Sequence, residues 1–149
     1  MRKKTVLLVE DNADDEVLAL KAFGRMDFGP QVVVRRDGEG ALDYLFGENV
    51  AAQRLGAHPP VVILLDLNLP GIDGLEVLRR IRQDDRTKLF PVVVLTSSTE
   101  ERDLNRSYRL GANSYIRKPV DFLEFTETVR HLATYWLQRN EPPPAPGAA

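Results

Sequence analysis

Five short runs rich in β-branched and other apolar residues alternate along the chain with longer segments in which apolar residues recur every three or four positions. The short runs are typical of strands in a parallel sheet, and the longer segments are typical of amphipathic helices. The expected strands are residues 5–9, 31–35, 61–65, 91–95 and 114–117, and the expected helices are residues 13–26, 38–46, 74–82, 100–110 and 121–139.

Strand and helix alternate five times, which predicts an α/β fold: a doubly wound (βα)5 three-layer sandwich with a parallel sheet and right-handed crossovers. The first helix carries Val17 and Leu20 at the spacing of one buried face. Residues 47–60 form a longer connection than usual, for which a helix extension and a surface loop both remain open. The proline-rich residues 141–149 are expected to be disordered, so that one domain covers residues 1–140.

Composition narrows the class of protein. The 149 residues are 43% hydrophobic and 28% charged, with a formal net charge of −2, so no general field attracts nucleic acid or an anionic membrane. Without cysteine, disulfides and thiolate chemistry are excluded. His58 and His131 are the only histidines, which argues against a histidine-rich metal site. The short apolar run near the N-terminus resembles neither a signal peptide nor a membrane span, and we expect a cytoplasmic protein.

Polar residues directly follow four of the five predicted strands. In a doubly wound sheet all strand carboxyl ends open at one edge, which is where such folds bind ligands. The residues are Glu10 and Asp11 after the first strand, Asp66 and Asn68 after the third, Thr96, Ser97 and Ser98 after the fourth, and Lys118 after the fifth.

Close carboxylates repel one another, and a divalent cation removes that repulsion. Because all candidate ligands are oxygens, Mg²⁺ or Mn²⁺ is favoured over Zn²⁺. Asp66 as a carboxylate nucleophile, Thr96 as a hydroxyl donor and Lys118 as a counter-charge complete the parts needed for phosphoryl transfer. Each group alone has a simpler explanation as a helix cap, a turn residue or a surface lysine, but their joint occurrence at four strand ends favours the functional interpretation.

Four motifs carry a family resemblance: Val9-Glu10-Asp11-Asn12, the segment from Leu65-Asp66 to Asp73-Gly74, Leu95-Thr96-Ser97, and the segment from Gly111 to Lys118-Pro119. Together they resemble the motif set of response-regulator receiver domains, and the resemblance spans residues 5 to about 138. It implies a flavodoxin-like fold with strand order 2-1-3-4-5. It also implies a phospho-acceptor that promotes its own phosphorylation and dephosphorylation, rather than a conventional enzyme.

The resemblance implies a role for each site residue. Asp66 would accept a phosphoryl group from a sensor histidine kinase. Asp11, Asp66 and the backbone carbonyl of Asn68 would bind the metal ion directly, and Glu10 would hold a metal-bound water. Thr96 and Lys118 would contact the phosphoryl group, with a cis bond between Lys118 and Pro119. The switch pair would be Thr96 and Tyr115, and the residues that tune phosphoryl lifetime would be Asn68 and Ser98.

Output is expected to pass through protein contacts, because no effector domain or helix-turn-helix follows the last predicted helix. Residues 47–60 and the long last helix resemble the single-domain regulators that pair with bacterial phytochromes, which makes a phytochrome a candidate kinase. The last helix carries a stripe of Phe125, Val129, Leu132 and Trp136, with further apolar residues outside it at Leu123, Tyr135 and Leu137. This surplus predicts a homodimer through the fourth helix, fifth strand and fifth helix. The sparsely apolar fourth helix, residues 100–110, is the element expected to move.

Four other functions are alternatives to this interpretation. A phosphorelay intermediate that passes the phosphoryl group onward uses the same site. An aspartate-nucleophile phosphatase would need a second acid where Asn68 stands. A flavodoxin-like cofactor binder would need a phosphate loop after the first strand, where the acidic run from Glu10 to Asp15 would repel phosphate. A phosphorylation-independent scaffold would have lost the polar residues at the strand ends.

Overall fold

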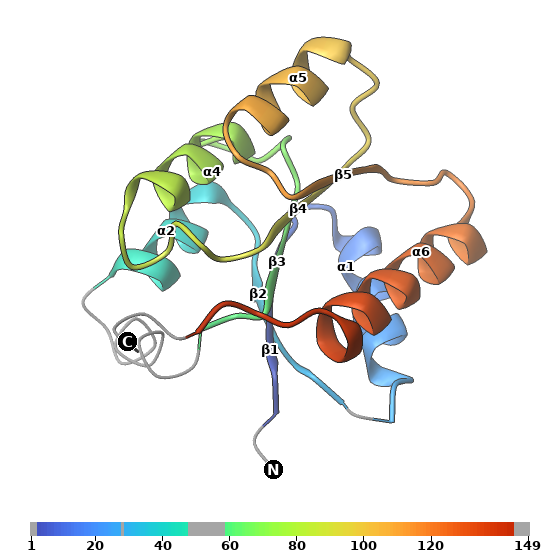
Figure 1. Cartoon of the computed structure of the whole chain (residues 1–149). Coiled ribbons are helices and arrows are strands. Elements are labelled where there is room, and N and C mark those ends of the chain that lie inside the picture. Colours follow the sequence, from blue (N-terminus) through green and yellow to red (C-terminus); the bar gives the residue numbers. More distant parts are fainter. Residues whose placement is uncertain (1–2, 28, 48–58, 145–149) are drawn as a thin grey trace.

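The computed structural model describes residues 3–27, 29–47 and 59–144, and a five-stranded parallel sheet runs through their centre (Figure 1). The strands lie in the order β2-β1-β3-β4-β5, which confirms the predicted fold and strand order. Their bounds are β1 Thr5–Val9, β2 Gln31–Arg35, β3 Val62–Leu65, β4 Val92–Thr96 and β5 Ser114–Arg117.

Helices cover both faces of the sheet, as Figure 1 shows. One face packs against α1 and α6, and the other packs mainly against α2 and α4, with α5 beside α4. Asn12, Asp37, Asp73 and Asp121 cap α1, α2, α4 and α6, each accepting a backbone N–H. The bounds are α1 Ala13–Gly24, α2 Gly38–Phe46, α4 Gly74–Gln83, α5 Glu101–Arg109 and α6 Phe122–Thr134.

The side chains of β1 alternate between two apolar layers. Leu7 and Val9 join the layer beneath α2 and α4, whereas Val6 and Leu8 join the layer beneath α1 and α6. Every residue of β3 is buried, which confirms the prediction of a strand covered on both faces. The sheet is therefore a rigid frame whose carboxyl ends are held in a fixed register.

The buried face of α1 differs from the prediction. Val17 and Leu20 are exposed, and the helix instead buries Ala19, Ala22 and Phe23. All three lie in the apolar layer that α1 shares with α6, where the small side chains of Ala19 and Ala22 suit the close contact between the two helices.

The last helix changes its geometry near its end. After α6, residues Tyr135–Arg139 form a π-helical turn, in which the N–H of Asn140 donates to the carbonyl of Tyr135 at 2.7 Å. Leu137 is buried in the core, so the expectation that it belongs to an exposed apolar surface is wrong. Phe125, Val129 and Leu132 are buried as predicted, and Trp136 is half-buried.

Two segments with predicted properties lie wholly or partly outside the described residues. The connection over residues 47–60 is described only at Gly47 and from residue 59 onward, and the tail over residues 141–149 only to Pro144. Within the described residues, no helix is long and apolar enough to cross a membrane.

Candidate functional site

A cavity of about 580 Å³ opens at the carboxyl ends of the strands. It is lined by residues that follow β1, β3, β4 and β5, together with the start of α1. The lining residues are Asp11, Asn12, Asp15, Asp66, Asn68, Ser97, Lys118, Pro119 and Val120.

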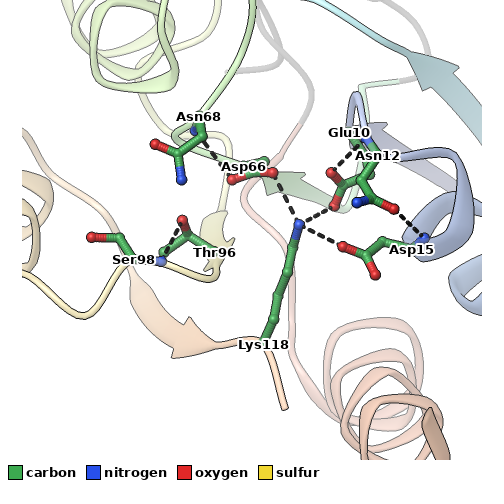
Figure 2. A network of polar contacts seen from close by, with 8 residues as sticks. All are labelled: Glu10, Asn12, Asp15, Asp66, Asn68, Thr96, Ser98 and Lys118. Carbon is green, nitrogen blue, oxygen red and sulfur yellow. Dashed lines mark hydrogen bonds and ion pairs between the residues drawn. The ribbon is translucent and has the colours of Figure 1, made fainter. Parts of the chain in front are cut away.

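Lys118 lies at the centre of the charged groups (Figure 2). Its Nζ is 2.8 Å from Oε1 of Glu10, 2.9 Å from Oδ2 of Asp15 and 3.0 Å from Oδ2 of Asp66. The backbone supports this placement, because the N–H of Lys118 donates to the carbonyl of Thr96 at 2.8 Å. Three carboxylates from β1, α1 and β3 are thus joined by one ammonium from the end of β5.

Burial and charge shift the protonation of this group. Burial, with a smaller contribution from the charge of Asp66, raises the pKa of Glu10 to about 8 against the opposing effect of its hydrogen bond with Lys118. Burial lowers the pKa of Lys118, but its hydrogen bonds with Glu10 and Asp15 outweigh this and raise the pKa above its ordinary value. Lys118 therefore stays charged, and a cation beside Glu10 would restore that carboxylate to its ionised form.

The carboxylates of Glu10, Asp11 and Asp66 form a group suited to a metal ion. One oxygen from each lies within 4.8 Å of the others, and this is an all-oxygen set. Glu10 and Asp66 are buried, whereas Asp11 is exposed at the mouth of the cavity. Hard divalent cations such as Mg²⁺ or Mn²⁺ match this donor set and keep positions free for water and phosphate.

Asp66 is fixed on both of its oxygens. Oδ1 accepts the backbone N–H of Asn68 at 3.2 Å, and Oδ2 contacts Lys118. The residue is buried between β3 and the start of α4, where space is tight: a Cβ added to Gly74 would lie 2.2 Å from the Asp66 carbonyl oxygen. Glycine at position 74 thus lets α4 begin directly against the phospho-acceptor candidate.

The hydroxyl groups form a separate chain on the β4 side. The buried Thr96 accepts the backbone N–H of Ser98 on its Oγ1 at 3.2 Å, and the Ser98 hydroxyl donates to Oδ2 of Asp103 in α5 at 2.6 Å. Tyr115 packs its ring against the apolar layer beneath α2 and α4, and burial raises the pKa of its hydroxyl. The chain links the end of β4 to α5 without passing through Lys118.

One expected backbone feature is absent. No peptide bond in the described part of the chain is cis, so the bond between Lys118 and Pro119 is trans. Trans is the favoured isomer of X–Pro bonds. The ammonium of Lys118 reaches all three carboxylates from this backbone, which corrects the expectation of a cis bond.

One contact was missed from the sequence. The sequence places Asp15 only at the end of the acidic run that follows the first strand, yet Asp15 pairs with Lys118. The available signal was its place as the third residue of α1, because side chains at this position reach back toward the preceding segment. A helix that begins directly after a site strand thus adds its own residue to the site.

Comparison with known proteins agrees with this geometry. A family model, "Response regulator receiver domain", matches residues 6–130. The probable methanogenesis regulatory protein FilR2 of Methanothrix harundinacea is 43% identical over 138 residues, or 93% of this chain and 86% of that protein.

Two solved structures extend the comparison. The phosphorylated cyanobacterial phytochrome response regulator RcpA has 39% identity and a TM-score of 0.89, with 96% of this chain and 100% of that chain covered. The Mn²⁺-bound form of response regulator Rcp1 has 35% identity and a TM-score of 0.86, with 95% and 99% covered.

Proposed function

This chain belongs to the response regulator receiver family, and we propose that Asp66 accepts a phosphoryl group from a sensor histidine kinase in a metal-dependent reaction. The observation that carries the proposal is the placement of Asp66: a buried carboxylate that contacts Lys118 and shares a metal-suited cluster with Glu10 and Asp11. Residues 1–140 form the receiver unit of this proposal, since the family match and the last helical turn both end before residue 140.

The transfer is a substitution at phosphorus. One carboxylate oxygen of Asp66 forms the new bond, the phosphorus–nitrogen bond of the donor phosphohistidine breaks, and its electron pair returns to the imidazole. Lys118 is already 3.0 Å from Asp66, close enough to pair with the added negative charge. Dephosphorylation is a separate step: water attacks the phosphorus, the phosphorus–oxygen bond to Asp66 breaks, and inorganic phosphate leaves the free carboxylate. Asn68 and Ser98, beside Asp66 and Thr96, are the residues proposed to tune that rate.

The donor set fits Mg²⁺ or Mn²⁺. Asp11, Asp66 and the backbone carbonyl of Asn68 are the proposed direct ligands, with Glu10 acting through a water molecule. The ion would supply charge neutralisation between the carboxylates and the incoming phosphoryl oxygens. The Mn²⁺-bound structure of the similar Rcp1 supports this choice of ion.

The proposed output path runs through the hydroxyl chain. Thr96 would turn its hydroxyl toward the phosphoryl group and release the N–H of Ser98. Because the Ser98 hydroxyl donates to Asp103 of α5, this change would reach that helix. Tyr115 is the proposed partner of this switch, because its buried hydroxyl interacts with the side chain of Ser98, which belongs to the same hydroxyl chain. Movement of the hydroxyl chain would then shift α5 and the surface around it.

The proposed signalling surface is a homodimer face made by α5, β5 and α6. A groove of about 600 Å³ lies along β5 and α6, with Tyr135 and Trp136 at one end. Tyr108 of α5 and Tyr135 are each about half exposed, at 51%. A monomer in sedimentation at micromolar concentration, both with and without a beryllofluoride phosphoryl mimic, would contradict this face.

The proposed kinase is a sensor histidine kinase, with a phytochrome as the leading candidate. Support comes from the similarity to RcpA, a cyanobacterial phytochrome response regulator. Purified phytochrome kinases and non-phytochrome kinases, compared for the rate of phosphoryl transfer to this chain, would test the pairing.

The central test uses a small phosphodonor. Incubation of the full chain with acetyl phosphate and Mg²⁺ should add one phosphoryl mass that base or hydroxylamine removes. Asp66→Asn should abolish the adduct, and a chelator should abolish it in the wild type. Asp85→Asn is the matched control, because Asp85 is a strongly exposed carboxylate whose partner is Lys88. An adduct that survives Asp66→Asn would refute the proposal.

A further inference from the structure

Asp15 is one of three carboxylates that hold the Lys118 ammonium, and it alone lies outside the metal-suited cluster. A lysine ammonium has three N–H donors and no acceptor. Here Glu10, Asp66 and Asp15 each lie within 3.0 Å of it, so the donors match the acceptors in number. Figure 2 shows Asp15 reaching Lys118 from the side opposite Asp66.

The backbone holds Asp15 in place independently of this contact. Its N–H donates to Oδ1 of Asn12 at 3.0 Å, the cap of α1. The Asp15 side chain is 22% exposed, whereas those of Glu10 and Asp66 are 3% and 5% exposed. Asp15 is thus a fixed carboxylate at the mouth of the cavity, beside the buried group.

The position of Asp15 in the first turn of α1 does not by itself explain its contact with Lys118. Asp14 and Glu16 also lie in the first turn of α1, where acidic residues favour the positive end of the helix. Glu16 binds Arg36, and Asp14 has no ion pair among the described residues. Of these three acids, Asp15 is the one whose side chain contacts Lys118.

We propose that Asp15 is a positioning residue that keeps the Lys118 ammonium at the site while Glu10 and Asp66 are engaged by a metal ion and by the phosphoryl group. This inference rests on the proposed function and adds a residue to it. The ammonium and the cation compete for the same two carboxylates and repel each other. Asp15 offers the ammonium a partner that the cation does not need.

The consequence of losing Asp15 follows from that competition. Without it, both remaining partners of Lys118 belong to the metal-suited cluster. A cation would then compete with the ammonium at both of its remaining partners. Metal affinity should fall, and Lys118 should be less well placed beside Asp66 when the phosphoryl group arrives.

The test is a double-mutant cycle read by Mg²⁺ affinity, measured by titration calorimetry on the full chain. Asp15→Ala should weaken Mg²⁺ binding about fivefold, the size of a favourable ion-pair coupling. Asp14→Ala, the matched control, removes the same charge one residue away and should change the affinity less than about twofold. In a Lys118→Ala background, Asp15→Ala should have no more effect than Asp14→Ala.

Two results would overturn the role of Asp15. One is an equal loss of Mg²⁺ affinity in Asp14→Ala, which would indicate that any negative charge at the start of α1 has the same effect. The other is an undiminished loss in the Lys118→Ala background, which would show that Asp15 does not act through Lys118. Should Asp15→Ala fail to fold, Asp15→Asn keeps the size of the side chain and removes the charge, and the same cycle applies.

A second readout separates this inference from the proposed function. At saturating Mg²⁺, the rate of phosphorylation by acetyl phosphate should fall about fivefold in Asp15→Ala and little in Asp14→Ala. Absence of wild-type phosphorylation together with an intact affinity cycle would refute the proposed function and leave the positioning of Lys118 standing. Normal phosphorylation together with no coupling between Asp15 and Lys118 in the Mg²⁺ affinity cycle would refute the role of Asp15 and leave the proposed function standing.

Discussion

Two neighbouring helices, α4 and α5, flank the same side of the site but are attached to the molecule very differently. The α4 helix buries Gly74, Leu75, Val77, Leu78 and Ile81. In α5, all of whose residues are described, Ser107 is the sole buried residue. A helix with so few apolar contacts can move at low cost, whereas its neighbour holds the phospho-acceptor candidate still. The α4 helix is thus firmly anchored beside Asp66, whereas α5 is weakly anchored and free to shift when the site changes.

The largest test of this contrast truncates one aliphatic residue in each helix. Ile81→Ala in the fully buried part of α4 should lower the free energy of unfolding by about 3 kcal/mol, because it leaves a cavity in the core. Leu104→Ala in α5 should cost about 1 kcal/mol or less, because Leu104 is only partly buried. Urea denaturation of both variants measures the difference, and equal costs would show that α5 is anchored as firmly as α4.

A second test addresses the start of α4. Gly74→Ala should cost about 2 kcal/mol, because its new methyl group meets the backbone of Asp66 and Leu67. It should also slow phosphorylation by acetyl phosphate, since the residue displaced is the proposed acceptor. Glu101→Ala at the start of α5 is the control, because Glu101 is exposed and should leave both quantities nearly unchanged. A harmless Gly74→Ala would mean that α4 does not constrain Asp66.

Hydrogen exchange compares the helices without mutation. The amides of α5 should exchange at least about tenfold faster than those of α4 and α6, as expected for a helix that opens locally. Addition of beryllofluoride and Mg²⁺ should change the exchange of α5 and leave that of α4 close to its starting value. Equal protection of α5 and α6 in both states would remove α5 as the moving element.

The smallest expected effect concerns the one buried side chain of α5. The hydroxyl of Ser107 is buried without a hydrogen-bond partner among the described residues. Ser107→Ala removes this unpaired group and should stabilise the protein by up to about 1 kcal/mol. Exchange of α5 amides should slow in parallel. A destabilised variant would show that this hydroxyl has a partner in solution, such as a bound water molecule.

The strand ends could be predicted from the sequence because the parallel sheet leaves little freedom. A buried apolar run indicates where a strand ends, and parallel strands bring those ends to one edge of the sheet. The sequence alone therefore predicts that Glu10, Asp66, Thr96 and Lys118 lie close together. The rotation of α1 could not be predicted in this way. Its pattern offered Val17 and Leu20 as the buried face, yet packing against α6 selects Ala19, Ala22 and Phe23.

The contact between Asp15 and Lys118 escaped prediction for a related reason. It depends on how the first turn of α1 is oriented by its Asn12 cap, which is a matter of local geometry rather than of residue spacing. The π-helical turn at Tyr135–Arg139 is likewise a feature of local geometry. Its wider turn changes which side chains face the core, and Leu137 is buried there. Patterns predict which element carries a residue, and packing decides where that residue points.

The ion pairs of Lys118 have a consequence for how the protein is made. Lys118 joins Asp66 across 52 positions and Asp15 across 103, so its partners are synthesised long before it. A growing chain on the ribosome has its acidic residues in place but lacks their counter-charge until the fifth strand emerges. The charged group at the site therefore cannot be complete until β5 and the residue that follows it have been synthesised.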